Sequence, residues 1–119
     1  MPKLRVWNRS RNILLAGRAT TAGTSKERRT GLLAHNSLEQ GEGLWIVPCE
    51  AVHTIGMKFP IDVLFLDRKR KVLKITKEMK KWRMAACFRA HSVLELPAGI
   101  AAATSTTVGD QLELEKYDV

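Results

Sequence analysis

The sequence has few cysteines, few aromatic residues and no long apolar run, and each shortage excludes a class of protein. Two cysteines, Cys49 and Cys87, are too few to build a disulfide framework. No apolar segment approaches the roughly 18 residues that cross a bilayer as a helix. The composition also excludes a collagen and a low-complexity chain. What remains is a globular protein of 119 residues, a length that predicts one domain over residues 1–119.

The N-terminal segment lacks the features of a secretory signal. Such a signal needs an uninterrupted apolar stretch of about 7–15 residues. The nearest candidate, residues 13–16, stops at Gly17 and Arg18. We therefore expect a cytoplasmic protein with reduced thiols and no membrane partner. The sequence leaves the oligomeric state open.

Short apolar segments separated by turn residues predict six or seven β-strands. The clearest feature is a hairpin of residues 61–66 and 71–77, in which Asp67 is expected to bond its own downstream backbone. Residues 25–34 predict a helix with Thr24 or Ser25 as its N-cap, and residues 98–103 predict one or two helical turns. Further strands are expected at 4–7, 12–16, 44–47, 92–96 and 111–115. The expected fold class is mainly β (α+β by content), a compact β-sandwich or barrel-like domain with one short helix.

The net charge of +8 is concentrated in two basic blocks, residues 1–35 and 68–90. The second block holds ten Lys and Arg residues against one acid, Glu78. Clustered cations are typical of a surface that binds nucleic acid or another polyanion. Such a module would use the basic hairpin 68–83, chiefly Arg68, Lys69, Arg70, Lys71 and Lys74. A solvated hairpin is favoured over this alternative, because base stacking needs several exposed aromatics and the chain has only seven aromatic residues.

Asp62 is the most unusual residue, because it lies in a strand whose two faces are both apolar. Side chains alternate along a strand, so Asp62 must point toward an interior or a pocket whichever face it takes. A buried carboxylate is costly unless it is paired or hydrogen-bonded. Arg28, His53 or backbone N–H groups are the candidate partners. Glu95 lies in another apolar strand and therefore also needs a charged or hydrogen-bonding partner.

These residues suggest a pocket that binds a small, anionic ligand. Trp45, Met57, Phe59 and Phe65 would wall the pocket. Its predicted polar contacts and neighbours are Arg28, His53, Thr54, Met57, Asp62 and Glu95. The alternative for Asp62 is that it accepts hydrogen bonds from a loop and fixes the end of its strand.

An enzyme is a further alternative, in which Asp62 and His53 form an acid–base pair, since imidazole titrates near neutral pH. A Cys49–His53 nucleophilic pair also stays open, although a buried thiol is more often inert. No metal or cofactor is expected. Cys49 and His53, like Cys87 and His91, are four residues apart, and on extended strands that spacing separates two ligands by about 13 Å.

Several motifs occur in an order that resembles one known family. They are Arg28–Leu33 (Arg-x-x-Gly-Leu-Leu), Gly43–Cys49, His53–Met57, Phe59–Asp67, Val93–Gly99 and Gly109-Asp110. Together they resemble the bacterial and archaeal family called domain of unknown function 192, from about Val6 to Leu112. The resemblance implies a mostly β domain of the sandwich or barrel kind, whose short helix carries the Arg-x-x-Gly-Leu-Leu segment. It implies no established activity.

The family's polar pattern falls on six positions of this chain: Arg28, His53, Thr54, Asp62, Glu95 and Asp110. The chain departs from the family in two respects. It lacks the export signal of some relatives, and it has Lys69-Arg70 where a glycine is usual in the hairpin turn after Asp67. Fold analogy alone assigns no role to these residues.

Overall fold

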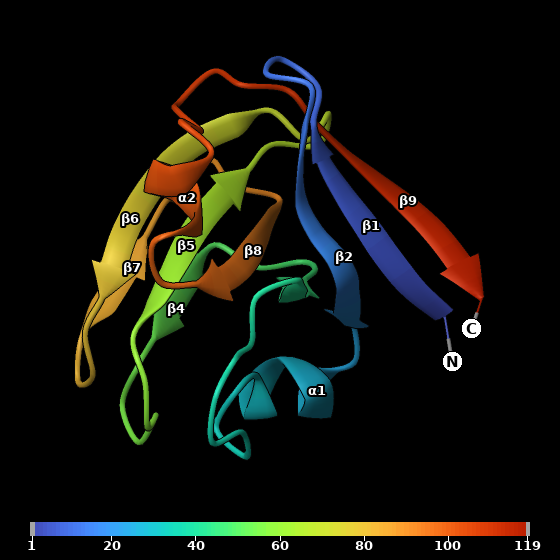
Figure 1. Ribbon diagram of the computed structural model, residues 1–119. Coiled ribbons are helices and arrows are strands. Elements are labelled where there is room, and N and C mark those ends of the chain that lie inside the picture. The colour runs from blue at the N-terminus through green and yellow to red at the C-terminus, as the bar shows by residue number, and fades with distance from the viewer. Residues whose placement is uncertain (1, 119) are drawn as a thin grey trace.

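A computed structural model describes residues 2–118. Within them the chain forms nine strands and two short helices, so the expectation of a mainly β fold is confirmed. The strands are β1 (Pro2–Asn8), β2 (Ile13–Ala22), β3 (Glu42–Ile46), β4 (Ala51–His53), β5 (Ile61–Leu66), β6 (Val72–Met79), β7 (Met84–Ala86), β8 (Ser92–Pro97) and β9 (Leu112–Asp118). The helices are α1 (Ser25–Thr30) and α2 (Ile100–Ala103) (Figure 1).

Seven strands form one mixed sheet in the order β6-β5-β8-β3-β2-β1-β9. All neighbours in it are antiparallel except β2 and β3. The sheet curls until its two edge strands meet at one point, where Lys71 bridges Gln111. The result is a barrel-like fold that is open along most of that seam. Strands β4 and β7 form a separate two-stranded sheet.

The curled sheet separates two apolar cores. The barrel core contains Leu64, Leu66, Leu94 and Leu96. The outer core, on the other face of the same strands, contains Val63, Phe65 and Val93 and is covered by Leu32, Val52 and Met57. Because β5 and β8 lie between the two cores, all six residues of β5 are buried. This explains why its apolar residues do not alternate with polar ones.

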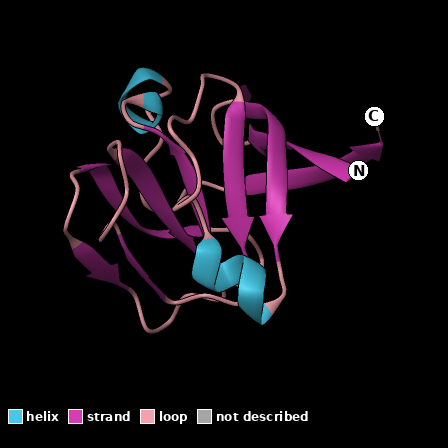
Figure 2. Ribbon diagram, turned by 90° about the horizontal axis from the view of Figure 1, so that it is seen from below, coloured by secondary structure: helices cyan, strands magenta, loops and turns pink. Residues whose placement is uncertain are grey.

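Helix α1 begins where the sequence predicts. Thr24 is the N-cap, and it forms a capping box with Glu27. The helix is shorter than expected because Gly31, at φ +47°, ends it after Thr30. The second helix, α2, occupies the segment expected to make one or two helical turns. Seen from below, α1 and α2 lie in separate places beside the sheet (Figure 2).

The hairpin β5–β6 is confirmed in detail. One carboxylate oxygen of Asp67 accepts hydrogen bonds from the N–H groups of Lys69 (2.8 Å) and Lys71 (2.9 Å). Arg70 takes the left-handed conformation, at φ 69°, that glycine would favour. The predicted end of the second strand at Gly17 is wrong, since β2 continues to Ala22 and pairs with β3 from Arg18 onward. Neither helix in residues 2–118 is long and apolar enough to span a membrane.

Candidate functional site

A cleft lies between α1 and the free edge of β4, with Glu95 of β8 in its lining; we call it the α1–β4 cleft. Its inner chamber, of about 300 Å³, has Arg28, His53, Met57 and Glu95 in its lining. An adjoining outer chamber, of about 650 Å³, is lined by residues that include Arg68 and His91. Both chambers share Arg28, Arg29, Ile46, Cys49 and Ala51. Four of the six residues expected at a ligand pocket thus line one cavity.

Glu95 is buried without a compensating partner. Its side chain lies on the outer-core face of β8, because it pairs across the sheet with Val63 of β5. Glu95 is 3% exposed, and its Oε1 atom has no hydrogen-bond partner. No ion pair reaches it within residues 2–118. Burial raises the pKa of Glu95 to about 7. Near neutral pH this carboxyl is therefore partly protonated and able to donate a hydrogen bond into the inner chamber.

Two other residues of the cleft also hold buried polar atoms without partners. The guanidinium of Arg28 is directed at the Pro48 carbonyl oxygen (3.4 Å) and at Ser25 Oγ (3.3 Å), but its Nε has no acceptor. His91 Nδ1 is also unpartnered. Of the six such side-chain atoms found in the described part of the chain, three therefore belong to residues of this cleft. Buried polar atoms are normally satisfied by protein groups or by ordered water, so these three atoms leave hydrogen-bonding capacity open within one cavity.

The outer chamber is electropositive. Arg28, Arg29 and Arg68 line it, against the single carboxylate of Glu50. Burial, reinforced by the charges of Arg68 and Arg70, lowers the pKa of His91, so its imidazole is neutral near pH 7. The arrangement suits an anionic group near the arginines, with a neutral imidazole beside it.

Cys49 lines both chambers. Its thiol donates a hydrogen bond to the Ala51 carbonyl oxygen (3.2 Å). Burial is the main cause that raises the pKa of Cys49, so the thiol is protonated at neutral pH. A protonated thiol is a poor nucleophile, and this geometry gives the Cys49–His53 alternative no support. Cys49 and Cys87 are both free.

The prediction that Asp62 shares this pocket is wrong. Asp62 pairs across the sheet with Leu96, and both side chains face the barrel core, on the side of the sheet opposite Glu95. The Asp62 carboxylate is fully buried and accepts three backbone hydrogen bonds, from the N–H groups of Glu78 (2.7 Å), Gly99 (3.2 Å) and Ala101 (2.8 Å). It anchors the end of β6 and the start of α2. An Asp62–His53 acid–base pair is therefore excluded by geometry.

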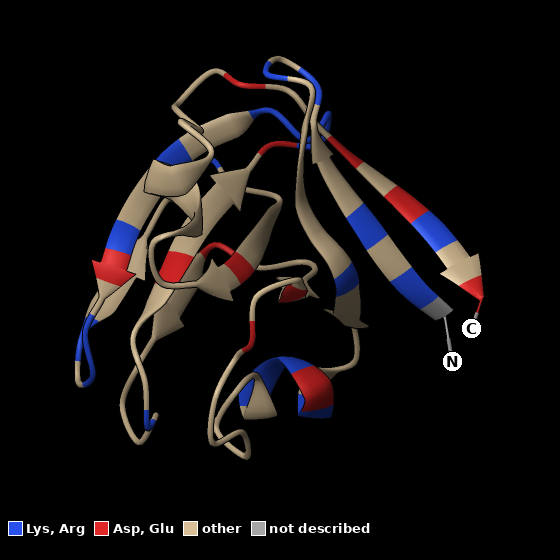
Figure 3. Ribbon diagram, viewed as in Figure 1, with Lys and Arg blue, Asp and Glu red and all other residues tan. Residues whose placement is uncertain are grey.

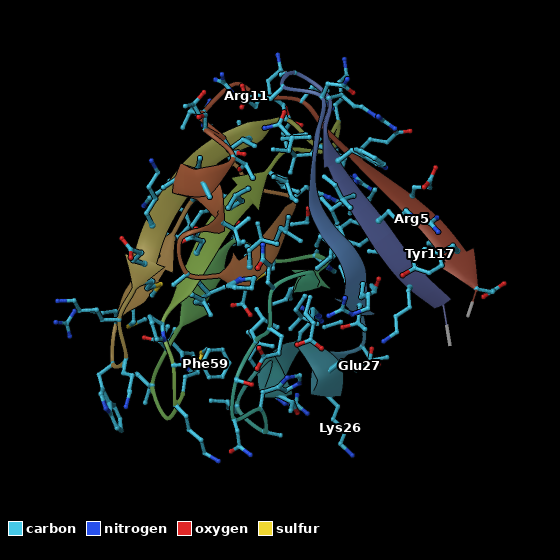
Figure 4. The ribbon with its side chains drawn as sticks, in the orientation of Figure 1. Arg5, Arg11, Lys26, Glu27, Phe59 and Tyr117 are labelled. Atoms are coloured by element: carbon cyan, nitrogen blue, oxygen red, sulfur yellow. The ribbon has the colours of Figure 1, made fainter. Side chains whose placement is uncertain are left out.

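Thr54 and Asp110 also have structural partners. The Thr54 hydroxyl donates to the Lys80 carbonyl oxygen (2.5 Å) and accepts from the Arg83 N–H (2.8 Å), which fixes the turn between β6 and β7. Asp110 bonds the buried amide of Asn8 (2.9 Å) and the guanidinium of Arg11 (2.9 Å). Figure 4 shows Arg11 at the end of the molecule opposite α1.

Of the expected pocket walls, only Met57 lines the inner chamber. Trp45 lies in the barrel core and Phe65 is buried within the outer core. Phe59 packs against the outer core from its edge. These aromatic rings stabilise the sheet instead of forming the cavity.

The basic residues of the hairpin 68–83 do not form one patch. Cations gather at both ends of β6, which are far apart (Figure 3). At the first end Arg68 lines the outer chamber, and the Arg70 guanidinium lies 4.7 Å from the centre of the Trp45 ring. Lys74 donates to the Ala86 carbonyl oxygen (2.8 Å). Of the basic turn, only Arg68 is among the residues that line the α1–β4 cleft.

Sequence reasoning did not assign Arg29 and His91 to the pocket. Arg29 directly follows Arg28 on α1, and this adjacency is the sequence feature that could have placed Arg29 in the pocket. No such feature identifies His91. It lies at the cleft because the Cys49 N–H donates a hydrogen bond to the His91 carbonyl oxygen (3.0 Å), and these two residues are far apart in the sequence. Within residues 2–118, no three His, Cys, Asp or Glu side chains gather as a metal-binding group.

The chain is similar to proteins from bacteria and archaea. A UPF0127 protein of Pyrococcus furiosus is 37% identical over 76 residues, which are 59% of this chain and 65% of that protein. A protein of unknown function from Novosphingobium aromaticivorans has a solved structure that matches with a TM-score of 0.78, at 24% identity, over 93% of this chain and 83% of that one. A Sinorhizobium meliloti structure, named as a candidate transcription regulator, matches with a TM-score of 0.83, at 19% identity, over 96% of this chain and 94% of that one.

At these identities the two solved structures show the fold alone. The model of the family DUF192, described as "Uncharacterized ACR", matches residues 6–114, nearly the whole chain. This match covers all the motifs that carried the resemblance and confirms it. The chain belongs to the DUF192 family.

Proposed function

We propose that this protein binds a small organic anion in the α1–β4 cleft. The observation that carries the proposal is the concentration of unpartnered buried polar atoms there, on Arg28, His91 and Glu95. A ligand that satisfied them would recover the free energy lost by leaving them unpaired, which is about 1–3 kcal/mol for each group.

The two chambers define the chemistry of this ligand. Its anionic group would bind Arg28, Arg29 and Arg68 in the outer chamber. Its apolar body would contact Leu32 and Met57 in the inner chamber. A hydrogen-bond acceptor at its far end would meet the protonated carboxyl of Glu95. A carboxylate or phosphate ester of a few carbon atoms has this form.

Binding is expected to weaken as the pH rises through about 7. Below that pH the Glu95 carboxyl is neutral and donates a hydrogen bond. Above it Glu95 ionises and repels the anion, which lowers the affinity by about tenfold. Benzoate, which has the anionic group and the apolar body but no acceptor at its far end, is a suitable probe of the charge repulsion because it stays ionised from about pH 5.5 to about pH 8.5. Chemical-shift titrations across this range measure the effect, and Glu95→Gln should bind benzoate equally at both ends.

Removing an arginine of the cleft should weaken binding at every pH. Arg29→Ala is expected to raise the Kd for benzoate about tenfold, because a charge-assisted hydrogen bond is lost. Lys26→Ala is the matched control, since Lys26 lies on the same helix but points away from the cleft (Figure 4). Equal effects of the two substitutions would contradict the proposal, because they would show only a general dependence on charge.

A further inference from the structure

The β4–β7 sheet exposes a large apolar side chain, that of Met84, on its outer face. Val52 and Ala85 pair with each other and face the outer core. The neighbouring pair, His53 and Met84, must therefore point the opposite way, because side chains alternate along both strands. Met84 is 76% exposed, so its own side chain is largely uncovered.

Two large aromatic side chains lie at the ends of β7. Trp82, just before β7, is 66% exposed, and Phe88, just after it, is 81% exposed. Both exceed the exposure of most large apolar residues in the chain. The Trp82 N–H donates to the Thr54 carbonyl oxygen (3.2 Å), which holds the turn beside β4. The two aromatic residues thus lie in the turns on either side of β7, at most about 20 Å apart.

Exposed cations lie next to these apolar residues in the sequence. Residues 80–89 contain Lys80, Lys81, Arg83 and Arg89 and no acidic residue. All four are exposed. The bordering acids are Glu78, before this segment, and Glu50, whose carbonyl oxygen accepts from the Cys87 N–H. We call Trp82, Met84 and Phe88, with these four cations, the aromatic–basic face.

We propose that the aromatic–basic face binds single-stranded nucleic acid. Trp82 and Phe88 would stack against bases, while Lys81, Arg83 and Arg89 would contact phosphates. Phosphates flank each base of a single strand, and exposed cations flank the two aromatic residues in the sequence, Lys81 and Arg83 beside Trp82 and Arg89 beside Phe88. An anionic bilayer fits less well, because insertion needs an apolar surface that cations do not interrupt. None of its seven residues lines the α1–β4 cleft proposed above.

The test is fluorescence anisotropy with a labelled oligothymidylate of about 12 nucleotides. We expect binding that weakens steeply between about 50 mM and about 200 mM salt. Trp82→Ala and Phe88→Ala should each weaken it at least fivefold, because a stacked base is lost. Trp82→Phe should retain most of the affinity, since a ring remains. Val108→Ala is the matched control, because Val108 is 60% exposed on another part of the surface.

Three outcomes would overturn this proposal. The first is no binding at about 50 mM salt. The second is binding that Trp82→Ala and Phe88→Ala leave unchanged, which would indicate simple attraction to the net positive charge. The third is tighter association with vesicles of phosphatidylcholine and phosphatidylglycerol in equal parts, lost in Trp82→Ala, because this would identify a membrane-binding face. Circular dichroism of each variant shows whether it is folded.

Discussion

Replacing Glu95 with glutamine is expected to raise the free energy of unfolding by about 3 kcal/mol at pH 8 and to change it little below about pH 4. Burial raises the pKa of Glu95 from 4.5 to about 7 in the folded protein. Between these values the folded state binds a proton that the unfolded state has released. The stability of the native protein therefore falls as the pH rises through this window. Glutamine carries no charge at any pH and removes this cost.

Urea denaturation of both proteins at several pH values measures this effect. Glu78→Gln is the matched control, because Glu78 is exposed and its replacement should change stability little at any pH. The other titrating groups of the native protein are the same in Glu95→Gln, so they cancel in the comparison. A difference that did not vary with pH would show that the pKa of Glu95 is the same in the folded and unfolded states, and would contradict its burial as an unpartnered carboxyl.

Asp62→Ala is expected to destabilise the protein by about 4 kcal/mol, for a reason unrelated to the cleft. It removes the acceptor of three backbone N–H groups, those of Glu78, Gly99 and Ala101. An unsatisfied buried donor costs about 1–3 kcal/mol. Denaturation midpoints in urea measure the loss. Asp62→Asn should lose less stability, because its amide oxygen still accepts one or two of these bonds.

The Asp62 variants also distinguish a role of Asp62 in stability from a role in ligand binding. Because Asp62 faces the barrel core, folded Asp62→Asn should bind benzoate with the Kd of the native protein. A large loss of affinity in this variant would place Asp62 at the ligand site after all. Asp118→Ala, at an exposed position of β9, controls for the loss of a carboxylate and should leave stability nearly unchanged.

The sequence predicted correctly that Asp62 and Glu95 are buried, but it did not predict which groups each carboxyl contacts. An apolar run on both sides of Asp62 correctly indicated burial, because a strand between two cores buries both of its faces. Which core the side chain faces depends on the pairing of Asp62 with Leu96 and of Glu95 with Val63. That register arises from contacts distant in sequence. The two carboxylates were therefore predicted together, although they lie on opposite faces of one sheet.

Sequence patterns predicted correctly those features that depend on residues close together in the chain. Thr24, one of the two N-cap candidates, predicted the start of α1, and Asp67 predicted its own turn. Strands β4 and β7 were missed because three residues are too few to show a period. No pattern in the sequence therefore indicated that β4 would form one side of the cleft. The grouping of Arg28, His53 and Glu95 was predicted from their chemistry, since each is an ionisable residue near apolar segments.

The most direct test is a titration of the Glu95 side-chain carboxyl by carbon-detected NMR, with and without benzoate. An unpartnered carboxyl in an anion-binding cleft should titrate near pH 7 in the free protein. Saturating benzoate should move that midpoint higher, because a bound anion favours the neutral acid. A midpoint near the ordinary value of 4.5, unchanged by benzoate, would contradict both the burial of Glu95 and the binding site proposed around it.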